Sequence, residues 1–212
     1  LQAQRELESK MAMIREVQMF IPNGMLSYSV FMRMQARRAS AQEARAVLEE
    51  GVNRVLSVAV VHEFLSRNAS GTINVQEVAR RILRQLQDGL IDPSKQMQLT
   101  VRGPAIWLPA DRATHCALVI NELVQNAIEH GLAERAQGEV DVEFIDHGDE
   151  VTIIVTDNGQ GLPKGFELDS DSNLGLSIVK GIVERDLRGY FELQSDNGTR
   201  AIIRFDKSMA GG

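Results

Sequence analysis

The sequence predicts an α+β fold in which an antiparallel helical hairpin precedes a two-layer α/β sandwich. Three observations support this prediction. A heptad pattern of apolar residues runs near the N-terminus, residues 67–72 form a turn-rich joint, and helix and strand patterns mix after that joint. We therefore expect two domains, a helical hairpin over residues 1–68 and a mixed domain over residues 72–208.

The first domain is predicted from the spacing of its apolar residues. Residues 7–32 repeat apolar positions at steps of four and three, which is typical of a helix with a heptad seam, and Gln18 is a polar member of that seam. A capping box then opens a second helix over about residues 40–65. Two helices alone leave one side of the apolar stripe exposed. We therefore expect a homodimer through residues 1–68, in which two hairpins complete a four-helix bundle.

The second domain is predicted to alternate between helices and strands. A capping box at Asn74 predicts a helix to about Leu86. The elements expected after it are strands 96–101 and 105–108, a helix over 111–130, antiparallel strands 140–145 and 151–156, a helix over 174–186, and strands 190–194 and 200–205. Because the helices segregate from a mixed sheet, we expect a sandwich of two layers.

Composition and charge exclude some classes of function. Of the 212 residues, 43% are hydrophobic and 25% are charged, which is enough apolar surface to build a core. A net charge of −6 without a long basic run argues against direct binding of nucleic acid. The sequence contains no apolar run long enough to span a membrane and no signal peptide, so we expect a cytoplasmic protein.

One predicted helix carries polar residues on a single face. Glu122, Asn126 and His130 follow each other at a spacing of four, which places them on the same side of a helix. A stripe of this kind is usually a solvated surface. Asparagine is a poor helix former, however, so Asn126 indicates that its amide oxygen has a use, for example as a ligand of Mg²⁺.

A glycine-rich segment follows one of the predicted strands. Asp157 would end the strand, where its carboxylate can accept a hydrogen bond from an exocyclic amine. Gly159 and Gly161 would let the backbone approach a flat base closely. Taken alone, the segment is no more than a glycine-rich turn. Further along, residues 172–176 open a helix whose amides offer a phosphate site, and residues 197–199 begin a strand.

In their order from Thr114 to Phe205, these segments resemble the ATP-binding domain shared by histidine kinases, gyrases, the heat-shock chaperone of the same fold and the anti-sigma serine kinases. The resemblance implies a Bergerat-type site for ATP and Mg²⁺. It implies these roles: Glu122 as the carboxylate near the transfer centre, Asn126 as the Mg²⁺ ligand, His130 near the phosphates, Asp157 on the adenine amine, Gly159 and Gly161 around the base, Leu174, Gly175 and Leu176 at the nucleotide lid, and Thr199 at the water network of the adenine.

The N-terminal part resembles the dimerisation and phosphotransfer hairpin of one class of bacterial histidine kinases, on residues 15–17, 33–38 and 61–65. The resemblance implies that phosphate passes from ATP to a histidine and then to an aspartate of a response regulator, often one with an RNA-binding antiterminator domain. That family carries the run H-H-R-V-K-N-N, whereas this chain has Q-M-F-I-P-N-G over residues 18–24. Met19 therefore occupies the acceptor position, and its thioether cannot accept a phosphoryl group.

We therefore interpret the chain as the core of a histidine kinase in which the first helix is not phosphorylated. Two alternatives stay open. Met19 favours an ATP-binding pseudokinase or dimerisation scaffold without catalysis. An anti-sigma-type serine kinase would share the ATP-site residues, but the hairpin over residues 1–68 argues against it.

Overall fold

The computed structural model describes residues 51–52, 55–64, 71–168, 174–195 and 197–208. Two compact units make up the chain, Leu1–Thr72 and Ile73–Gly212. In the first unit, residues 51–52 and 55–64 are helical, within the range expected for the second helix. The expected first helix, with Gln18 and Met19, lies outside the described residues. No helix in the described part of the chain has the length and apolar character needed to cross a membrane.

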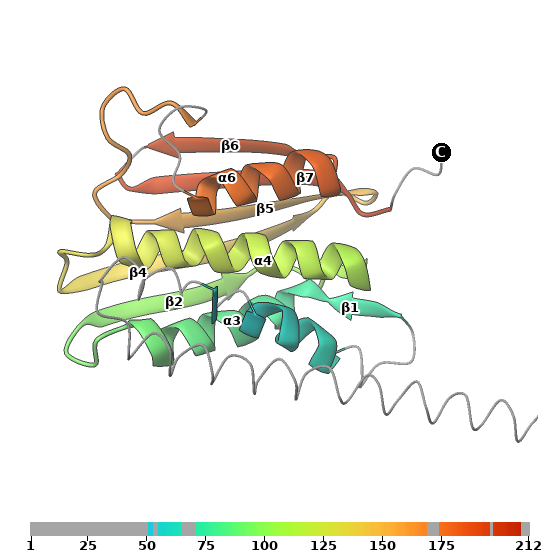
Figure 1. Cartoon of the computed structure of the whole chain (residues 1–212), viewed down its shortest axis with the longest axis horizontal. Helices are drawn as coiled ribbons and strands as arrows, with labels where there is room; N and C mark the ends of the chain where they lie inside the picture. Colours follow the sequence, from blue (N-terminus) through green and yellow to red (C-terminus); the bar gives the residue numbers. More distant parts are fainter. Residues whose placement is uncertain (1–50, 53–54, 65–70, 169–173, 196, 209–212) are drawn as a thin grey trace, which may run out of the picture. The chain divides into compact units, whose positions relative to one another are not determined.

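The second unit is built on a five-stranded mixed sheet with the strand order β2-β4-β5-β7-β6 (Figure 1). Its strands are β2 (Gln96–Arg102), β4 (Gln137–Asp146), β5 (Glu150–Asp157), β6 (Tyr190–Ser195) and β7 (Thr199–Asp206). Strand β2 runs parallel to β4, and the other neighbours are antiparallel. The antiparallel pairing of β4 with β5 was expected from their alternating sequences.

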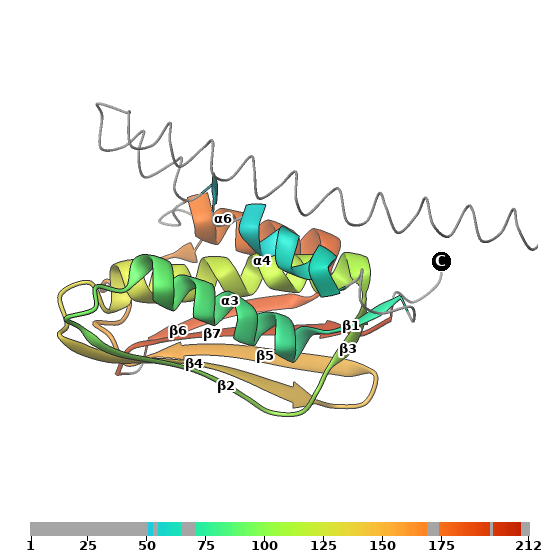
Figure 2. The same cartoon turned by 90° about the horizontal axis from the view of Figure 1, so that it is seen from below.

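The helices of this unit lie on one face of the sheet, so the predicted two-layer sandwich is confirmed (Figure 2). They are α3 (Val75–Leu90), α4 (Ala110–Asn126) and α6 (Leu174–Gly181). Two of them continue into π-helical turns: η1 (Ala127–Gly131) follows α4, and η2 (Ile182–Asp186) follows α6. The α4–η1 segment ends beside Asp157, the last residue of β5.

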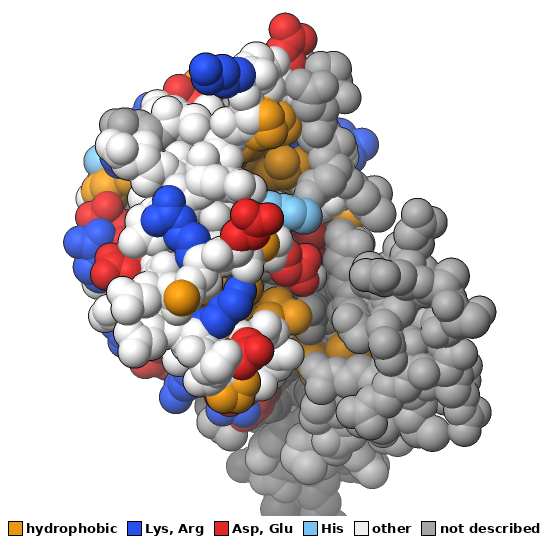
Figure 3. Space-filling view, turned by 90° about the vertical axis from the view of Figure 1, so that its left-hand side faces the viewer, with side chains coloured by type: hydrophobic (Ala, Val, Ile, Leu, Met, Phe, Trp, Pro, Cys, Tyr) orange, Lys and Arg blue, Asp and Glu red, His pale blue; other side chains and the backbone are white. Residues whose placement is uncertain are grey.

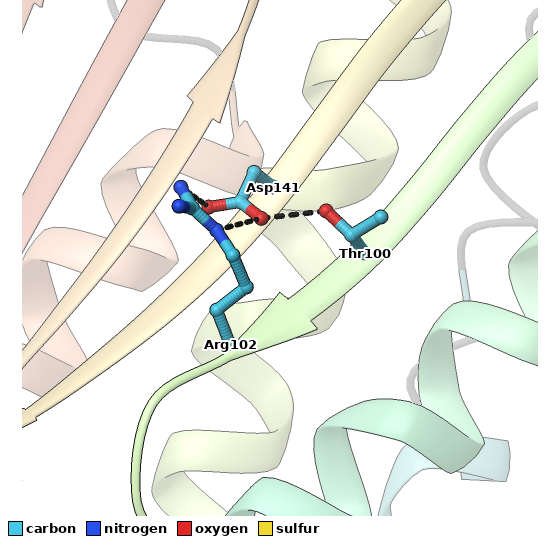
Figure 4. Close-up of polar contacts among 3 residues, drawn as sticks. All are labelled: Thr100, Arg102 and Asp141. Carbon is cyan, nitrogen blue, oxygen red and sulfur yellow. Dashed lines mark hydrogen bonds and ion pairs between the residues drawn. The ribbon is translucent and has the colours of Figure 1, made fainter.

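The period-two pattern of the strands separates the two faces of the sheet. Val142 of β4 pairs with Val155 of β5, and both side chains are buried toward the helices. Asp141, next to Val142, points to the opposite face, where it accepts hydrogen bonds from Arg102 and Thr100 of β2 (Figure 4). Because successive side chains point to opposite faces, apolar and polar residues alternate along a strand with one buried face, such as β4.

Three sequence-based predictions about individual elements were wrong. The α-helix expected over 174–186 ends at Gly181, where the π-helical turn η2 begins. The strand expected over 105–108 is instead β3 (Trp107–Pro109), which pairs with β1 (Thr72–Asn74) in a separate two-stranded sheet. The backbone N–H of Val75 bonds to the carbonyl of Ile106 at 2.8 Å, which ties β3 to the start of α3 rather than to the main sheet. The α-helix expected over 111–130 ends at Asn126, because η1 inserts a wider turn there.

Candidate functional site

A cavity of about 480 Å³ opens where α4 and η1 end over the sheet. Its polar lining residues are Asn126, His130, Asp157, Gln160 and Thr199. Figure 3 views the molecule from the side at which α4 ends, and shows acidic, basic and histidine side chains mixed with hydrophobic ones there. The cavity thus combines an apolar interior with a small number of polar groups, as ligand sites usually do.

The floor of the cavity is one row of side chains across three strands. Val155 of β5 pairs with Ala201 of β7, which in turn pairs with Leu193 of β6. All three residues line the cavity. Leu123 and Ala127, from α4 and η1, line the cavity as well. An apolar surface of this kind suits a flat aromatic ligand such as a nucleobase.

Asp157 is the buried acid of the cavity. It is the last residue of β5 and is only 5% exposed. Its Oδ1 atom accepts hydrogen bonds from the backbone N–H groups of Gly159 at 2.7 Å and Thr199 at 3.3 Å. Burial raises the pKa of the Asp157 carboxyl, and the two backbone hydrogen bonds oppose that rise. The carboxyl is therefore a fixed hydrogen-bond acceptor that water reaches poorly.

Two glycines bring the end of η1 against the segment that follows Asp157. A Cβ atom on Gly131 would lie 2.9 Å from Oδ1 of Asp157, and one on Gly159 would overlap with the carbonyl of Gly131. A side chain at Gly159 would require the backbone to move, and one at Gly131 would displace the Asp157 carboxyl. Gly159 is thus required by contact with the protein itself, whereas the sequence predicted that it would lie against the ligand.

Gly161 has a different role in the same segment. Its φ of +72° is a conformation that favours glycine, and a Cβ atom there would lie 2.5 Å from Oγ of Ser195. The same Oγ accepts a hydrogen bond from the backbone N–H of Leu162 at 3.0 Å. Contact with the β6–β7 hairpin therefore fixes the backbone at this edge of the cavity.

Of the three polar residues predicted to share one face of the long helix, two line the cavity and one does not. Asn126 and His130 line the cavity, although His130 lies in η1 rather than in an α-helix. Glu122 does not line it; this side chain is 3% exposed, and its Oε1 atom accepts a hydrogen bond from Nδ2 of Asn121 at 3.4 Å. The structure therefore brings together two of the three residues of the stripe.

The remaining predicted residues lie at the cavity or close to it. Gly161, Leu176 and Thr199 line it, whereas Gly159 and Gly175 do not. Gly175 is buried in α6, and Leu174 begins that helix. Among the described residues, no group of three or more His, Cys, Asp or Glu could hold a metal ion. The amide of Asn126 remains a suitable oxygen ligand for Mg²⁺, which commonly takes one or two protein ligands and completes its shell with phosphates and water.

Sequence reasoning missed several residues of the site. Those that it missed are Leu123, Ala127, Gly131, Val155, Gln160, Leu162, Pro163, Phe166, Leu193, Ser195 and Ala201. Strand alternation could have identified the floor, because Val155 lies two residues before Asp157 and Ala201 two residues after Thr199. No local signal marks Gly131, since its need for a small residue comes from the Asp157 side chain, which is distant in the sequence.

Two protein-family models match the chain. The model described as histidine kinase-, DNA gyrase B- and HSP90-like ATPase matches residues 111–209. The model described as histidine kinase matches residues 16–90. The first match contains α4 from its second residue, η1 and every residue that lines the cavity.

Similar proteins carry related descriptions. The chain is 38% identical over 203 residues to the sensor histidine kinase PdtaS of Mycolicibacterium smegmatis, covering 94% of this chain and 40% of that protein. PdtaS of Mycobacterium tuberculosis is 37% identical over 210 residues, covering 98% and 42%. The chain thus spans about two-fifths of the length of these curated relatives. The histidine kinase domain of the Erythrobacter litoralis EL346 blue-light-activated kinase shares the fold, with a TM-score of 0.67, 19% identity, and coverage of 85% of this chain and 95% of that one.

Proposed function

Since the chain belongs to the histidine kinase family, we propose that it is the catalytic core of a two-component sensor kinase. Its activity would be binding of Mg-ATP and phosphoryl transfer, first to a histidine and then to an aspartate of a response regulator. The observation that carries the proposal is the apolar floor that ends at the buried carboxylate of Asp157. That arrangement matches an adenine ring, which has a flat apolar face and an exocyclic amine at its edge.

The residues at the base end fit this ligand. Asp157 would accept the hydrogen bond of the adenine amine, and the row of Val155, Ala201 and Leu193 would contact the face of the ring. Thr199, whose N–H already bonds to Asp157, would hold water beside the base. Since Asp157 is fixed by backbone donors, it would need little reorganisation when the ligand binds.

The phosphates would lie toward Asn126 and His130. Mg²⁺, when bound, would neutralise phosphate charge and orient the transferred group, and the Asn126 amide oxygen would be its protein ligand. The resemblance assigns to Glu122 the role of orienting the attacking group; in this structure its side chain is buried one turn before Asn126 and does not line the cavity. Leu174, Gly175 and Leu176, at the start of α6, would close the site as part of the lid.

The hairpin would supply dimerisation and the contact with the response regulator. The histidine kinase match over residues 16–90 and the heptad pattern both support a homodimer through residues 1–68. The partner would be a cytoplasmic response regulator, and the family resemblance favours the kind with an RNA-binding antiterminator domain. The match of the hairpin also speaks against the alternative of an anti-sigma-type serine kinase.

Met19 removes the phosphoryl acceptor from the first helix. Phosphoryl transfer depends mainly on positioning and charge stabilisation, but it still needs a nucleophile, and a thioether is not one. We propose that the chain as it stands binds ATP without phosphorylating its first helix. The alternative, a pseudokinase that has also lost its transfer chemistry, is favoured by the same residue, so the experiment must separate the two.

Labelled ATP tests this proposal. The unaltered chain should give no base-stable phosphoprotein. A variant with the family run, made by Gln18→His, Met19→His, Phe20→Arg, Ile21→Val, Pro22→Lys and Gly24→Asn, should give a label that survives base and is lost in acid. Met19→His alone should recover little, because a misplacement of the ring by ~1 Å costs about 100-fold in rate.

Each other outcome has a definite meaning. If the full variant folds and binds ATP but takes up no label, the ATP-binding domain is that of a pseudokinase. If the unaltered chain takes up stoichiometric base-stable label, another histidine is the acceptor. His62, in the helix over residues 55–64, would then be tested first with His62→Ala.

A further inference from the structure

We propose that Gln160 is a positioning residue that fixes the phosphate end of the nucleotide site relative to its base end. The inference rests on the proposed function, because it assigns the two ends of the cavity to the two ends of ATP. It adds a role for a side chain that belongs to none of the predicted site residues. Gln160 lies between the two glycines of the segment after β5 and lines the cavity.

Gln160 forms two hydrogen bonds to the end of η1. Its side-chain Nε2 atom donates to the carbonyl of His130 at 2.9 Å, and its backbone N–H donates to the carbonyl of Gly131 at 3.0 Å. The last carbonyls of a helical segment have no partner within the segment itself. Gln160 therefore satisfies two consecutive carbonyls at the point where η1 ends.

This connection is possible because the two backbones lie in direct contact. Gly131 and Gly159 approach so closely that a Cβ atom on either would meet the opposite segment. The side chain of Gln160 acts on the residue just before this contact. It thereby holds His130, which lines the cavity, against the segment that begins at Asp157.

The base end is held by other bonds. Asp157 accepts from the N–H groups of Gly159 and Thr199, and Leu162 donates to Ser195. Asn158, next to Gly159, accepts a hydrogen bond from the backbone N–H of Glu139 at 2.9 Å through Oδ1. None of these bonds involves the Gln160 side chain. Its removal should therefore leave the base contacts in place and release only the end of η1.

Two ligands can distinguish a change at the end of η1 from a change at the base end: one that contacts both ends of the cavity and one that contacts the base end alone. Mg-ATP would contact Asp157 at one end and Asn126 and His130 at the other, whereas adenosine would contact the base end alone. Displacement of the end of η1 should weaken Mg-ATP and leave adenosine unaffected, because polar contacts to the phosphates from that end would lengthen beyond hydrogen-bond range while the base contacts stay. A side chain that only stabilised the fold would affect both ligands equally.

The test measures dissociation constants of the whole chain for Mg-ATP and for adenosine by titration. Gln160→Met keeps the length and charge of the side chain and removes its donor. Gln160→Asn keeps the amide but is one methylene too short to reach His130. For both variants we expect Mg-ATP binding about fivefold weaker, the effect of one exposed hydrogen bond, and adenosine binding within about twofold of the unaltered chain.

The matched control is Gln96→Met, at the exposed start of β2, which should change neither constant. Equal weakening of both ligands, or no change of either, would overturn the positioning role of Gln160. If the unaltered chain bound neither Mg-ATP nor adenosine, the proposed function itself would fail, and the inference with it. Thermal unfolding of each variant identifies any loss of folded protein.

Discussion

At Asp157, burial and hydrogen bonding act on one carboxyl group in opposite directions. Burial raises its pKa, while the N–H groups of Gly159 and Thr199 favour the charged form. Burying a carboxylate costs free energy, so a buried carboxylate in a cavity is a good candidate for a functional residue. It also ties together the strand end, the glycine-rich segment and the start of β7.

The contact between Gly159 and Gly131 predicts a residue-specific effect on stability. Gly159→Ala should lower the free energy of unfolding by about 1–3 kcal/mol, because its Cβ overlaps with the carbonyl of Gly131. The control is Gly89→Ala in α3, where a Cβ meets open space and helix propensity should add about 0.5–1 kcal/mol. Chemical denaturation compares the two variants. Equal stability of both would contradict the packing described for Gly159.

At the residue scale, the sequence predicted where the site residues lie more accurately than which neighbours they contact. It placed Asp157 at the end of a strand and Thr199 at the start of another, because strand patterns fix those ends. It assigned Gly159 to the ligand, whereas the close neighbour is Gly131. Such contacts join segments that are distant in the sequence, so no local pattern contains them.

Among the elements, β2 and β4 are joined by a polar cluster on the outer face of the sheet (Figure 4). Partial burial of Asp141 acts to raise its pKa, but hydrogen bonds from Arg102 and Thr100 outweigh it, so the pKa lies below the usual range. A lowered pKa stabilises the folded state at neutral pH. That stabilisation is lost as the pH falls through the folded-state pKa of Asp141.

Asp141→Asn should therefore destabilise the protein most at neutral pH and progressively less in acid. The loss at neutral pH should be about 0.5–1 kcal/mol, since Arg102 is largely exposed. Denaturation of both proteins across pH measures the difference, with Asp149→Asn in the β4–β5 turn as the control. A difference that grew on acidification would reverse the sign and contradict the assignment.

The elements themselves were mostly predictable, and the exceptions have identifiable causes. Alternation predicted β4, because one face of that strand is buried and the other is not, whereas β5 is buried on both faces over residues 151–155, where a run of β-branched residues favours a strand. The turn η1 was read as α-helix, because a π-turn differs by a single residue in spacing and keeps a helical composition. The pairing of β3 with β1 was not predicted, since a short apolar strand does not identify its partner.

For the whole molecule, the heptad seam over residues 7–32 predicts a homodimer. Sedimentation at several concentrations should show a mass that rises toward that of a dimer. Gln18→Leu, which replaces the polar member of the seam, should strengthen the dimer, because a polar residue in such a seam costs stability. A monomer mass that stayed constant with concentration in both proteins would contradict the prediction.

The order of the motifs along the chain supported the functional interpretation more than any single motif did. Each segment alone had an ordinary explanation, such as a solvated helix face or a glycine-rich turn. The sequence order of Asn126, Asp157 and Thr199 favoured one site, and the structure places all three around one cavity. Cavity shape still could not be predicted, because it depends on how the α4–η1 segment packs over the sheet.

Titration with Mg-ATP tests the central claim, that this cavity binds a nucleotide and that the Asp157 carboxylate recognises its base. The unaltered chain should bind Mg-ATP, and Asp157→Asn should weaken binding by about 1–3 kcal/mol, since its amide presents a donor or a weaker acceptor to the adenine amine. Asp149→Asn, in a turn outside the cavity, should leave the affinity unchanged. Equal affinity of the unaltered chain and a folded Asp157→Asn variant would contradict the account.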